Sequence, residues 1–409
     1  MLNSEQGLSK VKPDSITNIL TLRYDPSIKP NLPKKTWNHF KPSIQEPSIE
    51  FIEKSVKETI RKQLDTSDVK KVCVALSGGI DSTLILTLIK KTMPDIQIDA
   101  ISVKFANSVD ETENASKIAA ELEVDHHIVY VENYMRELPK AINIVKLPFW
   151  DLHWYHVAKK SQSISKHLAS GDGGDELFGG YTFRYKKFLS LITNSSTPLQ
   201  KTKAYLSCHE RDRVPDQEKL FGKKSGFSWE NIYKTLITYF DNPLSPLEQV
   251  FLADYNGKLL YNFNPINSRI IEKFDMELFT PLLNSKLISS ASHMKKSLKY
   301  DEINDIGKLP LRNILKKNGH DLLVGKQKLG FNVNTINLWK KHGYNLCKQF
   351  LNDSKVVRDG WINGDWIKMH IDSSDLDVKY VNKFFGILAF EIWYRLFITK
   401  EMDSNTILS

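Results

Sequence analysis

The chain has 409 residues, of which 41% are hydrophobic and 26% are charged. These proportions are typical of a packed globular protein and exclude a disordered or membrane-embedded chain. Lys and Arg outnumber Asp and Glu by 57 to 48, but the basic residues are dispersed in pairs, which favours a solvated surface over a nucleic-acid interface.

Signals for targeting and for disulfide formation are weak. Cys73, Cys208 and Cys347 lie far apart, which indicates neither a disulfide framework nor zinc spacing. No apolar run follows a basic start, and the most apolar stretch, residues 381–399, is interrupted by charged residues. We therefore predict a cytoplasmic protein with no signal peptide and no membrane span.

The pattern of apolar residues divides the chain into three parts. Residues 1–48 contain prolines at positions 13, 26, 30, 33, 42 and 47 and little apolar periodicity, so we predict an irregular arm. Apolar residues recur at helical spacing from Ile49 to Leu64, which predicts a packing helix. We expect residues 49–195 to form an α/β core and residues 196–409, where strand signals are few, to form a mainly helical region.

Strand and helix patterns alternate in the predicted core. The apolar run at residues 72–76 is followed by Ser77-Gly78-Gly79 and then by a helical pattern. Further strands are predicted at residues 98–103 and 127–131, with a helix at residues 113–122 between them. Such alternation predicts a mostly parallel sheet that binds ligands at the carboxyl ends of its strands.

The first candidate site is the turn at residues 77–82, Ser-Gly-Gly-Ile-Asp-Ser, where a strand leads into a helix. Backbone N–H groups and a helix N-terminus converge on an anion at such a turn, and glycine allows the phosphate a close approach. A glycine-rich turn alone is weak support, because such turns often need glycine for steric reasons. The turn lacks the lysine of a Walker A loop, which disfavours γ-phosphoryl transfer.

The second candidate site is residues 170–181, Ser-Gly-Asp-Gly-Gly-Asp-Glu-Leu-Phe-Gly-Gly-Tyr, with three acids among five glycines. Such a segment brings carboxylates to a backbone that approaches phosphates closely, and Mg²⁺ would make that arrangement favourable. A flexible acidic surface turn is the alternative. It does not account for Leu177, Phe178 and Tyr181, which are residue types that favour burial.

These two motifs carry a resemblance to a known family. Residues 77–82 resemble the PP-loop of the N-type ATP pyrophosphatases, and residues 170–181 resemble the asparagine synthetase family. The resemblance runs from about residue 50 to 397. It implies an α/β fold with a parallel-sheet PP-loop ATP pyrophosphatase domain, similar to the adenine nucleotide alpha hydrolases, and a mainly α C-terminal region.

The resemblance also implies an activity, ATP-dependent amide synthesis. A carboxylate, by default aspartate, is adenylated with release of pyrophosphate, and ammonia or another amine then attacks the adenylate. Catalytic roles are implied for Arg269, Glu277, Lys308 and Lys328, with Glu277 accepting the surplus proton of the amine. Mg²⁺ is implied at Asp81 and Asp175. The residues implied to contact ATP are Leu76, Ser77, Gly78, Gly79, Asp81, Ser82, Val103, Ser170, Gly171 and Asp172.

The sequence departs from the family pattern in its third quarter. Ser268, Ile271, Phe279 and Asn284 stand where the family has Asp, Ser, Arg and Asp. These departures leave open a degenerate, non-catalytic ATP-binding subunit. A PP-loop enzyme that modifies tRNA is the other alternative, because the chain is basic, although residues 170–181 argue against it.

The substrates are left open by the sequence. The first 48 residues are too few for a glutaminase domain, and we expect them to be the remnant of one. The amine is then free ammonia, ammonia from a separate glutaminase subunit, or an amine already on the substrate. The aromatic residues at 149–155 either pack in the core or line a pocket for a carboxylate larger than aspartate, and His153 and His156 are interpreted as packing or surface residues.

Overall fold

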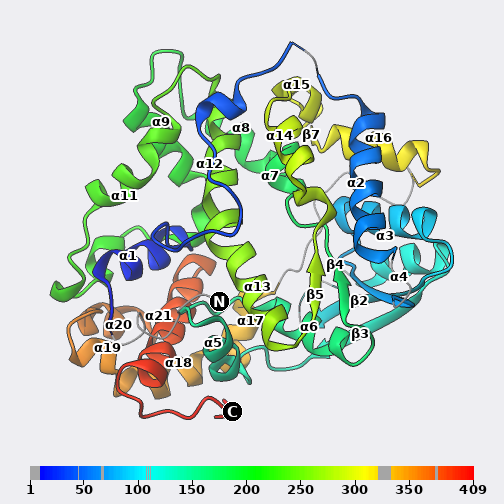
Figure 1. Ribbon diagram of the computed structural model, residues 1–409. Coiled ribbons are helices and arrows are strands. Elements are labelled where there is room, and N and C mark those ends of the chain that lie inside the picture. The colour runs from blue at the N-terminus through cyan, green and yellow to red at the C-terminus, as the bar shows by residue number, and fades with distance from the viewer. Residues whose placement is uncertain are drawn as a thin grey trace.

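A computed structural model describes residues 10–44, 46–65, 69–106, 108, 110, 112–320, 333–373 and 376–409. A five-stranded parallel sheet organises one half of the molecule (Figure 1). The strands are β1 (Lys71–Ala75), β2 (Gln97–Phe105), β3 (Asp125–Val131), β4 (His167–Ala169) and β5 (Glu277–Phe279), in the order β3-β2-β1-β4-β5. The chain leaves β1 toward β2 on one side and returns through β4 on the other, so a topological switch point lies between β1 and β4. The predicted α/β fold with a parallel sheet is confirmed.

Both faces of the sheet are buried, which is typical of parallel sheets. In β1, Val72 and Val74 belong to one hydrophobic core, while Cys73 and Ala75 belong to the other, as the two-residue period of a strand requires. The first core contains helices α2 (Ile49–Leu64), α3 (Ile80–Thr92), α4 (Thr112–Glu121) and α16 (Leu309–Lys317). The second contains α5 (Leu138–Val145), α6 (His153–Gln162) and α13 (Asn264–Lys273).

Helices build the rest of the molecule. Those that follow β4 in the chain are α7 (Gly174–Phe178), α8 (Thr182–Ser190), α9 (Pro198–Ser207), α10 (Gln217–Leu220), α11 (Trp229–Leu236) and α12 (Pro246–Asp254). A π-helical segment, η5 (Tyr255–Phe263), joins α12 to α13. After β5 come α14 (Ser285–Ser292), α15 (Lys296–Lys299) and an antiparallel hairpin of β6 (Tyr300–Asp301) and β7 (Ile306–Gly307), which leads into α16.

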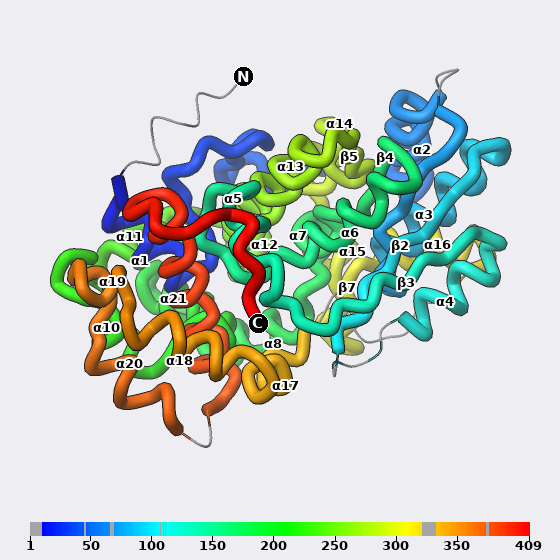
Figure 2. The backbone as a smooth tube through the Cα atoms, turned by 90° about the horizontal axis from the view of Figure 1, so that it is seen from below, coloured from blue at the N-terminus to red at the C-terminus, as the bar shows by residue number. Residues whose placement is uncertain are grey.

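The C-terminal helices gather on the side of the molecule away from the sheet (Figure 2). They are α17 (Thr335–Leu338), α18 (Tyr344–Asn352), α19 (Lys355–Arg358), α20 (Gly364–His370) and α21 (Val378–Phe397). Most of α21 is buried in the second core. Across the described ranges, no helix is both long enough and apolar enough to cross a membrane.

One part of the predicted organisation is wrong. The segment predicted as an irregular arm contains helix α1 (Pro13–Leu22), because Pro13 suits a first helical turn and Ile16, Ile19 and Leu20 bury one helical face in the second core. The region predicted as mainly helical is so, and it also supplies β5 to the sheet. A strand of three residues carries too little periodicity to be found in the sequence.

Candidate active site

A pocket of about 310 Å³ opens where β1 and β4 end, at the switch point of the sheet. The turn after β1 and the segment after β4 supply most of its lining. His153 and Trp154 come from α6, Phe263 comes from the end of η5, and Lys308 follows the β6–β7 hairpin. Segments distant in sequence therefore meet at one edge of the sheet.

The turn after β1 is shaped to approach an anion. Gly78 has a φ of +73°, a conformation that L side chains rarely adopt, and its carbonyl accepts a hydrogen bond of 2.7 Å from Asn114 Nδ2. The backbone N–H of Ser77 donates to Ser82 Oγ at 3.2 Å, and Ser82 Oγ donates to the carbonyl of Gly79 at 3.1 Å. Gly79 is the N-cap of α3 and offers no side-chain cap. The N-terminus of this 13-residue helix therefore faces the pocket as an anion-binding group.

The segment after β4 lies against that turn without room for side chains. A Cβ on Gly171 would lie 2.7 Å from the backbone carbon of Asp81, and one on Gly174 would lie 2.3 Å from Asp81 Oδ1. At Gly180 it would lie 1.8 Å from Asp175 Oδ1. Glycine at these positions is what allows the two acidic residues to stand together.

Lys308 joins the two acidic residues. Its Nζ donates to Asp81 Oδ2 at 2.5 Å and forms an ion pair with Asp175 Oδ1 at 2.8 Å. Its backbone N–H donates to the carbonyl of Phe178 at 2.9 Å, which fixes the residue to the end of α7. Burial disfavours the charged ammonium group, but the attraction of Asp175 and Asp81 outweighs it, so the pKa of Lys308 is raised.

Asp81 and Asp175 fit a magnesium ion that is bound together with phosphates. No group of three or more His, Cys, Asp or Glu side chains suited to hold a metal occurs within the described part of the chain. A metal at this pair would thus complete its shell with phosphate and water oxygens. That division of ligands is the one Mg²⁺ prefers, and the pocket that both carboxylates line leaves space for phosphates.

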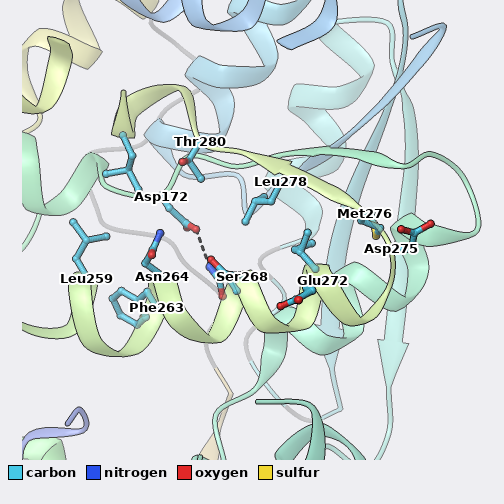
Figure 3. Close-up of a pocket in the computed structure, with 13 residues that line it drawn as sticks. Asp172, Leu259, Phe263, Asn264, Ser268, Glu272, Asp275, Met276, Leu278 and Thr280 are labelled. Carbon is cyan, nitrogen blue, oxygen red and sulfur yellow. Dashed lines mark hydrogen bonds between the residues drawn. The ribbon is translucent and has the colours of Figure 1, made fainter. Parts of the chain in front are cut away.

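A further carboxyl group, Asp172, lies between this pocket and a second one. The second pocket, of about 410 Å³, runs between α13 and β5 (Figure 3), and the two pockets share Asp172 and Phe263 in their linings. Asn267 Nδ2 donates to Asp172 Oδ2 at 2.8 Å. Burial, with a smaller contribution from Asp81 and Asp175, raises the pKa of Asp172 to about 6 against the hydrogen bonds from Ser170 and Asn267. This carboxyl group therefore titrates near neutral pH.

Comparison with known proteins agrees with this geometry. The sequence profile of the asparagine synthase family matches residues 52–395. The chain belongs to this family. The resemblance that residues 77–82 and 170–181 carry is thereby confirmed.

Individual relatives of the asparagine synthase family are distant. The chain is 26% identical to asparagine synthetase [glutamine-hydrolyzing] 1 of Bacillus subtilis strain 168, over 80% of this chain and 56% of that protein. It is 24% identical to a putative asparagine synthetase [glutamine-hydrolyzing] of Mycobacterium bovis, over 66% of this chain and 45% of that protein. The chain thus spans about half the length of these relatives. Among solved structures, an NMN synthetase from Francisella tularensis matches with a TM-score of 0.27 and 16% identity, over 50% of this chain and 91% of that chain.

The structure brings many of the residues predicted from the family pattern to the first pocket. Those that line it are Ser77, Gly79, Asp81, Ser82, Ser170, Gly171, Asp172, Asp175 and Lys308. Gly78 shapes the turn without lining the pocket. Leu76 and Val103 are buried in the two cores and do not line the pocket. Lys328 lies outside the described residues.

Two predicted catalytic residues lie elsewhere. Glu277 begins β5 and pairs in register with His167 at the start of β4, so it stands at the end of the sheet opposite to the pocket. Its side chain is 69% exposed and lies 3.4 Å from His167 Nδ1. Arg269 donates to the carbonyl of Val145 and thereby joins α13 to α5, and burial lowers its pKa. The register of β5 determines the position of Glu277, and the rotation of α13 determines the direction of Arg269. The family pattern specifies neither.

Some residues that line the pocket were not predicted as site residues. His153 and Trp154, interpreted as packing or left open in the sequence, both line it; Trp154 also packs in the second core, as Trp150 does. Burial lowers the pKa of His153, which favours its neutral form. Tyr181 lines the pocket and donates to Glu176 Oε1 at 2.6 Å. The aromatic cluster at residues 149–155 was the sequence signal that could have identified His153 and Trp154 as lining the pocket. No sequence pattern pointed to Phe263.

Proposed function

We propose that this protein is an AMP-forming amide synthetase that adenylates a carboxylate and transfers the acyl group to an amine. The observation that supports this most is the cluster of Asp81, Lys308 and Asp175 beside a lysine-free phosphate turn. The turn lacks the lysine with which a Walker A loop reaches the β and γ phosphates, and its resemblance to the PP-loop implies that it binds the released pyrophosphate. Membership of the asparagine synthase family supports the same chemistry and makes aspartate the first carboxylate to test.

In the first step, an oxygen of the substrate carboxylate attacks the α-phosphorus of ATP, and the bond to pyrophosphate breaks. The backbone of Ser77 and Gly79 and the N-terminus of α3 bind the departing pyrophosphate, and Lys308 neutralises part of its growing charge. Asp81 and Asp175 would hold Mg²⁺, which stabilises negative charge on phosphate oxygens when it is bound.

In the second step, the amine nitrogen attacks the acyl carbon, a C–N bond forms, and the C–O bond to AMP breaks. The amine must lose a proton, and Asp172 is the carboxyl group that faces both pockets. A pKa near 6 suits a group that accepts a proton at neutral pH. Asp172 therefore replaces Glu277 as the proposed proton acceptor.

The test is a screen of carboxylic acids, aspartate first, with ATP, Mg²⁺ and either ammonia, glutamine or an alkylamine. We expect AMP and pyrophosphate in equal amounts, formed only when a carboxylate is present. ADP and phosphate as the stoichiometric products would overturn the proposal. ATP binding without AMP under every condition would favour a non-catalytic subunit, and AMP formation stimulated by tRNA would favour a tRNA-modifying enzyme.

A further inference from the structure

The second pocket has the shape and chemistry of a site for an elongated, positively charged molecule. One face of α13 forms its floor with Asn264, Asn267, Ser268, Ile271 and Glu272, at the i, i+3, i+4, i+7 and i+8 spacing of a single helical stripe. Figure 3 shows β5 opposite, with Leu278 directed toward that helix, and Thr280, which directly follows β5, also lines the pocket. The cavity therefore extends along the helix axis.

The ionisable side chains of the pocket are all acidic among the described residues that line it: Asp172, Glu272 and Asp275. Asp172 lies at the end shared with the nucleotide pocket, and Glu272 and Asp275 lie toward the other end (Figure 3). Two cations lie near the acidic side chains at the outer end. Arg269, which Glu272 attracts, donates to the carbonyl of Val145. Lys166 forms a surface ion pair of 3.1 Å with Asp275, whose side chain is 89% exposed, so this pair contributes little free energy and an ammonium group of a ligand can compete for the carboxylate.

Apolar groups make up much of the rest of the lining. Leu259, Phe263, Ile271, Met276, Leu278 and Leu283 supply them. Asn267, which holds Asp172, and Glu272 are five residues apart on α13, a rise of about 7.5 Å along the helix axis. Acidic side chains toward both ends of the pocket, with Ile271 and Leu278 between them, suit a short alkyl chain that carries a positive group at each end.

We propose that the second pocket binds the amine substrate, and that this substrate is an alkylamine with a second cationic group, of which an α,ω-diamine is the simplest example. The inference rests on the proposed function, since it assigns the nucleophile of the second step. One ammonium group of the diamine gives a proton to the Asp172 carboxylate and becomes a neutral amine. That nitrogen attacks the acyl carbon, AMP leaves with the C–O electron pair, and the second proton passes to solvent. The other ammonium group stays charged beside Glu272 and Asp275.

Calorimetric titration of the full chain tests the site without turnover. The probes are 1,4-diaminobutane, n-butylamine and 1,4-butanediol, which share a four-carbon chain and differ in charge. We expect 1,4-diaminobutane to bind about two- to fivefold more tightly than n-butylamine, the range for contacts with exposed carboxylates, and 1,4-butanediol to bind more weakly than either. The double variant Glu272→Gln/Asp275→Asn should abolish the preference for the diamine.

The matched control is Glu230→Gln, which removes an exposed carboxylate on α11 from outside both pockets and should keep the preference. Equal binding of the diamine and n-butylamine by the wild type, or an unchanged preference in a folded double variant, overturns the inference. AMP formation with ammonia but without diamine selectivity overturns this inference alone. Selective diamine binding with no AMP formation from any carboxylate overturns the proposed function, and with it the role of the diamine as nucleophile.

Discussion

Replacement of Lys308 by methionine tests the ion cluster that joins the two glycine-rich segments. The change removes the ammonium group from its contacts of 2.5 Å with Asp81 and 2.8 Å with Asp175 while keeping a side chain of similar length. Removing one partner from a buried ion pair costs about 3–5 kcal/mol of unfolding free energy. We expect a loss near 3 kcal/mol, because the two carboxylate side chains are 17% and 20% exposed to the pocket.

Magnesium should restore part of that loss. A divalent cation bound by Asp81 and Asp175 replaces the missing positive charge, so Mg²⁺ should stabilise Lys308→Met more than it stabilises the wild type. At a Mg²⁺ concentration ten times its Kd, the gain is about 1.4 kcal/mol. Urea unfolding followed by tryptophan fluorescence, with and without Mg²⁺, gives these free energies.

The matched control is Lys234→Met, which removes an exposed lysine from a surface ion pair with Glu230 at 3.0 Å. We expect this control to lose less than about 1 kcal/mol and to show no response to Mg²⁺. If Lys308→Met is as stable as the control and equally insensitive to Mg²⁺, then Lys308 does not neutralise the two carboxylates, and the reasoning about the cluster is refuted.

Four further predictions concern the proposed chemistry and the stability of the site. Asp81→Asn and Asp175→Asn should each lower carboxylate-dependent AMP formation at least about 100-fold while the circular dichroism spectrum stays that of the wild type; full activity at ordinary Mg²⁺ would reject the metal assignment. Amide formation should rise as the pH increases through about 6, where Asp172 ionises, while exchange of pyrophosphate into ATP should not follow that titration; a flat amide profile would exclude Asp172 as the base. The raised pKa also means that ionisation of Asp172 destabilises the fold as pH rises from about 4 to 6, so Asp172→Asn should be more stable than the wild type at pH 7, by about 1–2 kcal/mol in urea unfolding. Glu277→Gln should change both half-reactions less than about twofold, because its side chain stands at the far end of β5; a selective loss of amide formation would restore its predicted role.

The nucleotide side of the site could be predicted from the sequence. An apolar strand followed by a glycine-rich turn and a helix places residues 77–82 at the carboxyl edge of a parallel sheet, and residues 170–181 follow another strand of the same sheet. Because all five strands are parallel, both segments emerge at one edge. Local pattern placed Asp81, whereas β4 was not predicted, and the family resemblance was needed to bring Asp175 to the same site.

The positions of Glu277 and Arg269 could not be predicted from the sequence in the same way. The place of Glu277 depends on the register of β5 with β4, and a three-residue strand leaves that register to tertiary packing. The direction of Arg269 depends on the rotation of α13, which follows a π-helical segment with a non-helical Gly257. Helical spacing of apolar residues in the sequence indicates which face of a helix is buried. It does not predict which pocket the other faces of that helix will line.

The close contact between Gly171 and Asp81 also bears on how the protein folds. These residues are 90 positions apart (171 − 81), so the phosphate site is completed only when β4 has docked beside β1. Loop closure over such a separation is slow, and a folding intermediate that contains only β1, β2 and β3 lacks half of the site. ATP should therefore slow unfolding and raise the unfolding midpoint, through binding to the native state alone, and leave the earliest refolding phase unchanged.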